Sequence, residues 1–197
     1  GALANAGNFD AIARVLAEFQ TIFMRLYYSP KPVVAAIQGR ALGGGCEIVM
    51  ACPQVVAAAE TYIGLVELSV GLVPGAGGLM GMVARAAERA GSESPERIQP
   101  FLKAAFETIA MAKVSGSALE AKAMGFLPPN AKILMNGDRR LYVAKQEVLH
   151  LEREGYMPPP ERNKIMVLGR AGRAQMGHAA YIVHQGGFIS DYDLYLA

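Results

Sequence analysis

The sequence lacks the features that mark several classes of protein. Its 19 basic and 17 acidic residues leave a net charge of only +2, whereas proteins that mainly bind nucleic acid carry a clear basic excess. No apolar run reaches the roughly 18 residues of a membrane span. Residues 1–5 lack the basic-then-apolar layout of a signal peptide. We therefore expect no nucleic-acid partner, no membrane span and a cytoplasmic location.

Cysteine is also scarce. Cys46 and Cys52 are the only two, six positions apart in an apolar stretch, so they form neither a disulfide framework nor a metal cluster. The three histidines, at positions 150, 178 and 184, follow no standard metal-binding spacing. The sequence predicts no metal site and favours a reducing compartment.

Apolar residues, in contrast, are abundant. They make up 52% of the 197 residues, and charged residues only 18%. This composition provides a core and excludes intrinsic disorder. The mean hydropathy of +0.23 is high for a monomer of this size, which indicates apolar surface that further chain segments or a second copy would cover.

Hydrophobic spacing predicts a helix over residues 8–28, with Asn8 as its N-cap. Short apolar runs at 33–37 and 54–58 flank a glycine turn and a short helix, an order that predicts a parallel βαβ unit. Ser117 and Glu120 have the spacing of a capping box. Further helices are expected at 80–90, 100–112, 117–124, 139–154 and 174–184, and a short strand could form at 165–168.

The triple glycine at 43–45 opens the short helix directly after the first predicted strand. Backbone N–H groups at such a helix start can hold a phosphate or a developing oxyanion. A phosphate loop would continue with Lys and Ser or Thr, but Cys46 and Glu47 follow here. An oxyanion hole beside an acid/base residue fits better, although close helix–strand packing would explain the glycines equally well.

Two glutamates, Glu47 and Glu67, lie in otherwise apolar surroundings. Such surroundings raise the pKa of a carboxyl and suit it to acid/base catalysis near neutral pH. A surface position is the alternative for each of them. A second glycine loop, residues 74–78, follows Glu67 and by itself is weak evidence of function.

Together these segments resemble the enoyl-CoA hydratase/isomerase (crotonase) family. The resemblance lies in the strand segment 31–39, in Ala-Leu-Gly-Gly-Gly-Cys-Glu at 41–47, in the segment 64–78, and in a later segment at 113–127. The remainder is most similar to the hydratase part of fatty-oxidation proteins that also carry a 3-hydroxyacyl-CoA dehydrogenase module. The resemblance implies one α/β domain over 1–197 with the crotonase-like ββα spiral fold, truncated at both ends, with a core at 1–127 and a helical part at 128–197.

The resemblance also implies a reaction, the syn addition of water to a trans-2-enoyl-CoA in fatty acid β-oxidation, which gives 3-hydroxyacyl-CoA. Gly44 would donate one N–H of the oxyanion hole, Glu47 would activate the water as general base, and Glu67 would deliver a proton to the α-carbon. No metal or redox cofactor is implied, because the coenzyme A thioester is the substrate.

Four more residues are implied to bind the substrate: Gly43, Gly75, Ala2 and Leu42. Ala2 belongs to the upstream loop that supplies the other oxyanion N–H in the family. Leu3 follows it where the family has an acidic residue, so this chain departs from the pattern there.

Two alternative functions stay open. One is a Δ3-Δ2-enoyl-CoA isomerase, a type that usually keeps only the carboxylate at the position of Glu67. The other is a non-catalytic acyl-CoA-binding or assembly module. The expected partners are an acyl-CoA substrate, further copies of the chain in a trimer or dimer of trimers, and a covalently linked dehydrogenase module.

Overall fold

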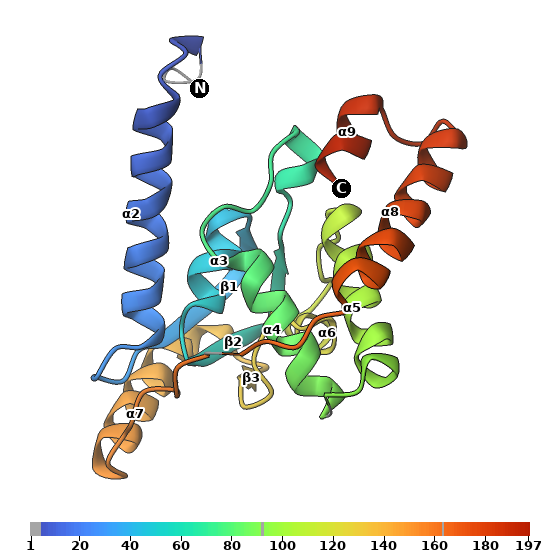
Figure 1. Cartoon of the computed structure of the whole chain (residues 1–197). Coiled ribbons are helices and arrows are strands. Elements are labelled where there is room, and N and C mark those ends of the chain that lie inside the picture. The colour runs from blue at the N-terminus through green and yellow to red at the C-terminus, as the bar shows by residue number, and fades with distance from the viewer. Residues whose placement is uncertain (1–4, 92, 163) are drawn as a thin grey trace.

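The computed structural model describes residues 5–91, 93–162 and 164–197 (Figure 1). Its helices are α2 (Phe9–Tyr27), α3 (Gly44–Met50), α4 (Gly78–Ala90), α5 (Pro95–Ala110), α6 (Ala118–Met124), α7 (Arg140–Arg153), α8 (Gly169–Gln185) and α9 (Asp191–Leu196), with short 3-10 helices η1 (Glu67–Val70) and η2 (Gly137–Arg139). Its strands are β1 (Val34–Leu42), β2 (Gln54–Gly64) and β3 (Lys132–Leu134). Within the described residues, each helix is too short or too polar to cross a membrane.

The expected parallel βαβ unit is confirmed. Strands β1 and β2 pair in parallel with α3 between them, and β3 joins the other edge of β2, also in parallel. Both long strands continue beyond the predicted runs at 33–37 and 54–58. The extension of β1 alternates between exposed and half-buried positions, and that of β2 mixes exposed with buried ones. A search for continuous apolar runs misses such strand residues.

The predicted helices are present, with shifted ends. The Asn8 side chain caps α2 by accepting a hydrogen bond from the Ala11 N–H at 3.1 Å. Helix α5 begins at Pro95, earlier than predicted, because the first helical position needs no N–H donor. The capping box of α6 forms only in part: the Ser117 hydroxyl accepts from the Glu120 N–H, but the Glu120 carboxylate accepts from the Gly116 N–H.

The prediction of a short strand at 165–168 is wrong. The described residues 164–168 have no regular structure and lead into α8. Leu168 packs against the hydrophobic core from this irregular segment. The free edge of β2 is taken by β3, which the sequence did not predict.

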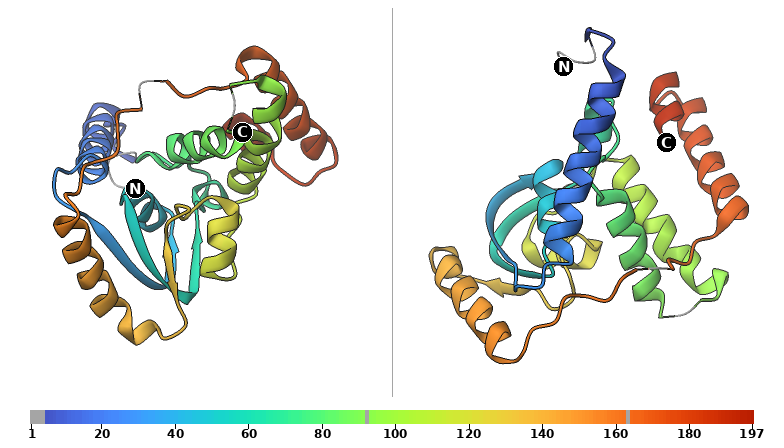
Figure 2. Two further views of the ribbon diagram at one scale, coloured as in Figure 1. Left: turned by 90° about the horizontal axis from the view of Figure 1, so that it is seen from below. Right: turned by 60° about the vertical axis from the view of Figure 1, so that its left-hand side comes forward.

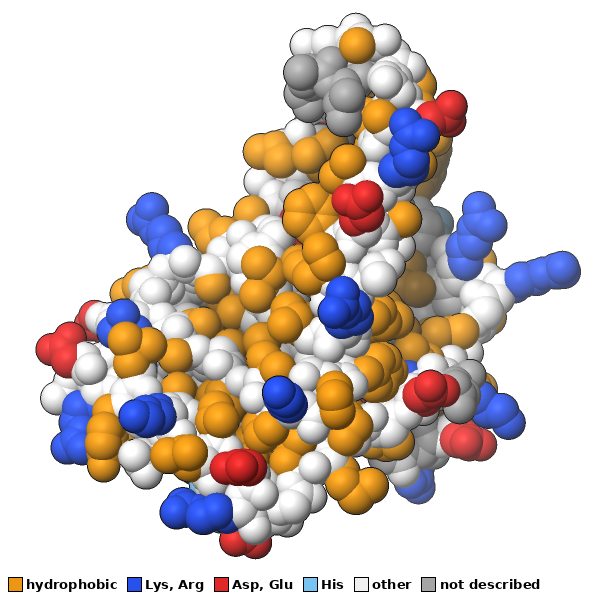
Figure 3. Space-filling model, turned by 90° about the vertical axis from the view of Figure 1, so that its left-hand side faces the viewer, with side chains coloured by type: hydrophobic (Ala, Val, Ile, Leu, Met, Phe, Trp, Pro, Cys, Tyr) orange, Lys and Arg blue, Asp and Glu red, His pale blue; other side chains and the backbone are white. Residues whose placement is uncertain are grey.

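The hydrophobic core lies between the sheet and helices α3 to α6. Helix α2 stands on one side of this body, and α8 and α9 stand on the other (Figures 1 and 2). Only Phe23 of α2 is buried, and apolar side chains stay exposed along the helix (Figure 3). These are Phe9, Val15, Leu16, Phe19 and Ile22. The exposed apolar surface accounts for part of the high mean hydropathy.

The buried Arg85 holds together the helices that carry the candidate site. From α4 its guanidinium donates to the carbonyl oxygens of Gly125 at 2.9 Å, Phe126 at 2.5 Å and Met50 at 3.3 Å. Burial lowers the pKa of this side chain to about 10, which leaves it charged at neutral pH. Because Met50 ends α3, the arginine fixes α3 against α4.

Helix α7 is joined to the sheet through the buried Glu147. Its carboxylate accepts a hydrogen bond from the Gln54 side chain at 2.8 Å and pairs with the Lys132 ammonium. Burial opposes ionisation of this carboxyl, but the bonds from Lys132 and Gln54 outweigh it and hold the pKa of Glu147 below its usual value.

Candidate active site

A glycine turn brings the two candidate catalytic carboxylates into one region. Gly43, between β1 and α3, has a φ of 54°, and its N–H donates to the Gly64 carbonyl at 2.9 Å. A Cβ at this position would lie 3.0 Å from Oε1 of Glu67. Four residues further on, the Glu47 N–H donates to the Gly43 carbonyl and continues the helix. The turn therefore needs glycine both for its conformation and for the approach of Glu67.

Glu47 is buried, with 4% of its surface exposed, and its Oε1 atom has two backbone donors. These are the N–H groups of Ala76 at 2.8 Å and Gly78 at 2.9 Å. A Cβ at residue 78 would lie 2.7 Å from Cδ2 of Leu65 and 3.0 Å from Oε1 of Glu47. The second glycine loop thus holds the Glu47 carboxylate, a role that the sequence analysis did not assign to it.

Glu67 has a different environment. It begins η1, and its Oε2 atom is buried with no hydrogen-bond partner among the described residues. Burial raises the pKa of the Glu67 carboxyl; the charge of Glu47 adds to this effect, and backbone hydrogen bonds within the turn oppose it. The expectation that apolar surroundings would raise a carboxyl pKa is confirmed here.

The predicted oxyanion donor, Gly44, is the first residue of α3 and is exposed. N–H groups in the first turn of a helix have no acceptor within the helix, so this one can donate to a ligand. Leu42 ends β1 with 36% of its surface exposed, and the Gly75 carbonyl accepts from the Gln20 side chain. Ala2 lies outside the described residues.

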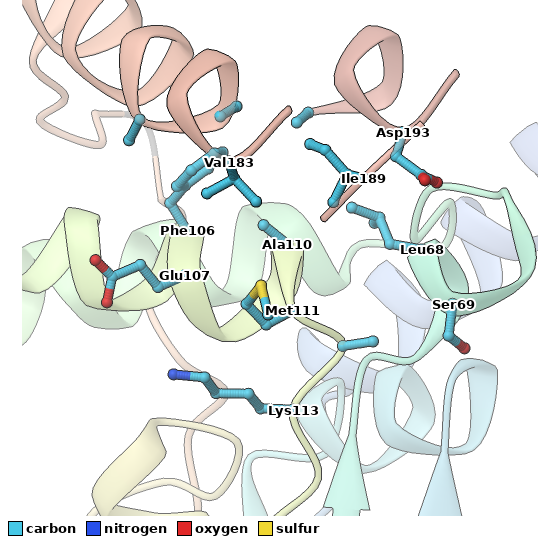
Figure 4. A pocket seen from close by; sticks show the side chains of 14 residues that line it. Leu68, Ser69, Phe106, Glu107, Ala110, Met111, Lys113, Val183, Ile189 and Asp193 are labelled. Carbon is cyan, nitrogen blue, oxygen red and sulfur yellow. The ribbon is translucent and has the colours of Figure 1, made fainter. Parts of the chain in front are cut away.

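An apolar cavity of about 570 Å³ lies beside η1, between α5 and the helices α8 and α9 (Figure 4). Leu68, Phe106, Ala110, Val183 and Ile189 are among the residues that line it. A second cavity of about 700 Å³ shares the first three of these. Neither cavity can be read from the sequence, because the residues that line each one come from segments far apart in the chain.

The chemistry of the region rests on carboxylates and backbone groups. Burial raises the pKa of the neighbouring Cys46 thiol well above its usual range, so this thiol is a poor nucleophile. Within the described parts of the chain, no three His, Cys, Asp or Glu side chains gather in a way that could hold a metal ion. The region brings two carboxyls in dissimilar environments beside the first N–H groups of α3, so it can transfer protons and donate hydrogen bonds to an oxyanion.

Comparison with known structures identifies the class of fold. The chain is similar to a Thermobifida fusca YX protein crystallised in complex with CoA, with a TM-score of 0.59, 18% identity, and coverage of 95% of this chain and 59% of that one. The parallel sheet with its covering helices is a crotonase-like α/β fold.

Comparison of sequences identifies the family. The model of the enoyl-CoA hydratase/isomerase family matches residues 3–99, and this part of the chain belongs to that family. A Bacillus subtilis (strain 168) protein named "Probable 3-hydroxyacyl-CoA dehydrogenase" is 40% identical over 190 residues, which cover 96% of this chain and 23% of the relative. A "Probable enoyl-CoA hydratase" of the same strain is 42% identical over 95 residues, 45% of this chain and 36% of the relative. The chain thus spans about a quarter of the first relative and about a third of the second.

Proposed function

We propose that this chain carries a hydratase site, which adds water across the double bond of a trans-2-enoyl-CoA to give 3-hydroxyacyl-CoA. The observation that carries the proposal is the contrast between the two carboxylates. Glu47 is buried with two N–H donors on one oxygen, whereas Glu67 has a buried oxygen without a partner and a raised pKa. Two carboxyls whose environments differ in this way suit a base and an acid acting together.

Each residue takes one step of the reaction. Glu47 accepts a proton from the water whose oxygen bonds to the β-carbon, and Glu67 gives its proton to the α-carbon. The thioester oxygen gains negative charge as the water adds, and the Gly44 N–H donates to it. Preorganised donors of this kind are worth roughly 10²- to 10³-fold in rate. A proton shift between the two carboxyls restores the starting state, so atoms and charge balance.

The apolar cavity beside η1 supports a fatty acyl substrate. Leu68 lines the cavity and directly follows Glu67 in the chain, whereas Glu47, Glu67 and Gly44 are not among the lining residues. An acyl chain held there would extend away from the carboxylates past Leu68. A volume of about 570 Å³ lies within the range of pockets that bury small ligands. Binding of CoA by the Thermobifida fusca YX protein supports a CoA thioester as the substrate.

The proposal extends to the whole protein. The relative named as a dehydrogenase supports a linked 3-hydroxyacyl-CoA dehydrogenase module that would oxidise the product. The exposed apolar side chains of α2 support a homo-oligomer. A trimeric state, a reaction without cofactor and a cytoplasmic location stay predictions.

The test is the hydration of crotonyl-CoA and of a longer 2-enoyl-CoA, followed as loss of the conjugated double bond. We expect turnover by the full chain, and a fall of roughly 10²- to 10⁴-fold in kcat for Glu47→Gln and for Glu67→Gln. Undiminished turnover by Glu47→Gln would refute the proposal. Isomerisation of a 3-enoyl-CoA by that variant would favour the isomerase, and CoA binding without turnover by the parent chain would favour the binding module.

A further inference from the structure

Helix α2 reaches the candidate site through the side chains of Gln20 and Leu16. The amide group of Gln20 donates from Nε2 to the Gly75 carbonyl at 2.8 Å and so joins two segments 55 residues apart. Leu16, one turn earlier, lies against the same loop, because a Cβ at Gly75 would be 3.1 Å from its Cδ2. The residues of α2 from 13 to 22 are exposed, and its buried residue, Phe23, lies nearer its C-terminal end.

The peptide group that Gln20 binds is the one that holds Glu47. The Gly75 carbonyl and the Ala76 N–H belong to a single planar peptide unit, and this N–H donates to Oε1 of Glu47 at 2.8 Å. A continuous chain of hydrogen bonds therefore runs from Gln20 through the peptide to the carboxylate. Bonds in such a chain strengthen one another, because each one polarises the group that makes the next.

The loop needs this restraint because of its glycines. Gly75 supplies the carbonyl of this peptide, and Gly77, with a φ of 112°, directly follows Ala76. Glycine adopts many backbone conformations at low cost, so rotation of the 75–76 peptide would turn the Ala76 N–H away from Glu47. The Gln20 amide, which donates to the Gly75 carbonyl of the same peptide, opposes that rotation.

We propose that Gln20 is a positioning residue for Glu47, which it orients by holding the 75–76 peptide. The proposal rests on the proposed hydratase function, since it assigns a role in that reaction. The Gly78 N–H stays on the same carboxylate oxygen without Gln20. Loss of Gln20 therefore weakens the orientation of the general base without abolishing it.

The test compares three variants of the full chain. Gln20→Met keeps the length and helix propensity of the side chain but has no donor, and Gln20→Lys restores an N–H donor. Thr21→Ala is the matched control, because the Thr21 hydroxyl donates to the Ala17 carbonyl within α2. Because Gln20→Met removes one exposed hydrogen bond, we expect its kcat to be roughly three- to ten-fold lower than that of the parent, with its KM within about two-fold of the parent value. We expect Gln20→Lys to lie closer to the parent than to Gln20→Met, and Thr21→Ala to match the parent.

Amide hydrogen exchange at Ala76 gives a readout that needs no activity. Exchange at this N–H should be faster in Gln20→Met than in the parent, and unchanged in Thr21→Ala. An unchanged kcat and unchanged exchange in Gln20→Met would overturn the proposal, as would a Gln20→Lys kcat as low as that of Gln20→Met. Absence of hydration by the parent chain would refute the proposed function instead, and the exchange rates would still decide whether Gln20 holds the peptide.

Discussion

Glu47 supports the glycine loop whether or not it acts in catalysis, so removal of its carboxyl should lower the free energy of unfolding. The variants that separate the two roles are Glu47→Ala and Glu47→Gln. Alanine leaves the N–H groups of Ala76 and Gly78 without their acceptor. Glutamine can place its amide oxygen where Oε1 now lies, and so keeps both bonds at 2.8 and 2.9 Å.

The magnitude follows from the burial of these two donors. A buried donor left without a partner costs about 1–3 kcal/mol. The Gly78 N–H is buried and the Ala76 N–H is partly buried, so water can reach the second more easily. We expect Glu47→Ala to lose about 2–4 kcal/mol and Glu47→Gln less than about 1 kcal/mol. The two variants should nevertheless lose hydratase activity to a similar extent.

Urea unfolding measures the difference. With an m-value of about 2 kcal/mol per molar urea, the Glu47→Ala midpoint should fall by about 1–2 M. Glu67→Ala is the comparison variant, since Oε2 of Glu67 has no hydrogen-bond partner among the described residues and burial raises the pKa of its carboxyl, so its midpoint should fall less than that of Glu47→Ala. Equal midpoints for Glu47→Ala and Glu67→Ala, or a Glu47→Gln midpoint as low as that of Glu47→Ala, would refute the reasoning.

Three further predictions test other parts of the structure. Gly43→Ala forces a side chain into a backbone conformation, φ 54° and ψ −126°, that residues other than glycine rarely adopt, at a cost of about 1–3 kcal/mol, and it places Cβ 3.0 Å from Oε1 of Glu67. The kcat should fall while the circular dichroism spectrum stays native, and a normal kcat would contradict the close approach. Burial raises the pKa of the Cys46 and Cys52 thiols, that of Cys52 to about 11. Both thiols should therefore resist iodoacetamide in the native chain and react after unfolding in urea, and rapid labelling of the native chain would argue against their burial. Folding lowers the pKa of Glu147, so the contribution of this carboxylate to stability is present above its unfolded pKa of about 4.3 and is lost as pH falls through the folded value. Glu147→Gln should therefore flatten the dependence of the urea midpoint on pH below about pH 5. An unchanged slope in this variant would contradict the assigned role of Glu147.

Local patterns in the sequence determined a large part of the fold. The cap at Asn8, the prolines after α2, the glycine turn before α3 and the stop at Gly125 each act through the backbone conformation or hydrogen bonds of nearby residues. The same holds for the choice of Glu47 and Glu67 as candidates, because an acidic residue in an apolar stretch is visible without a structure.

Contacts between distant segments were decided only by the tertiary structure. Oε1 of Glu47 meets N–H groups 29 and 31 residues away, and Gln20 meets Gly75 across 55 residues. The pairing of β3 with β2 likewise depends on which strand edge the rest of the fold leaves free. The spacing of apolar residues predicts which residues of a helix or strand are more buried than their neighbours. The atoms that it meets depend on the path of the whole chain, because a hydrogen bond requires two groups within about 3 Å of each other.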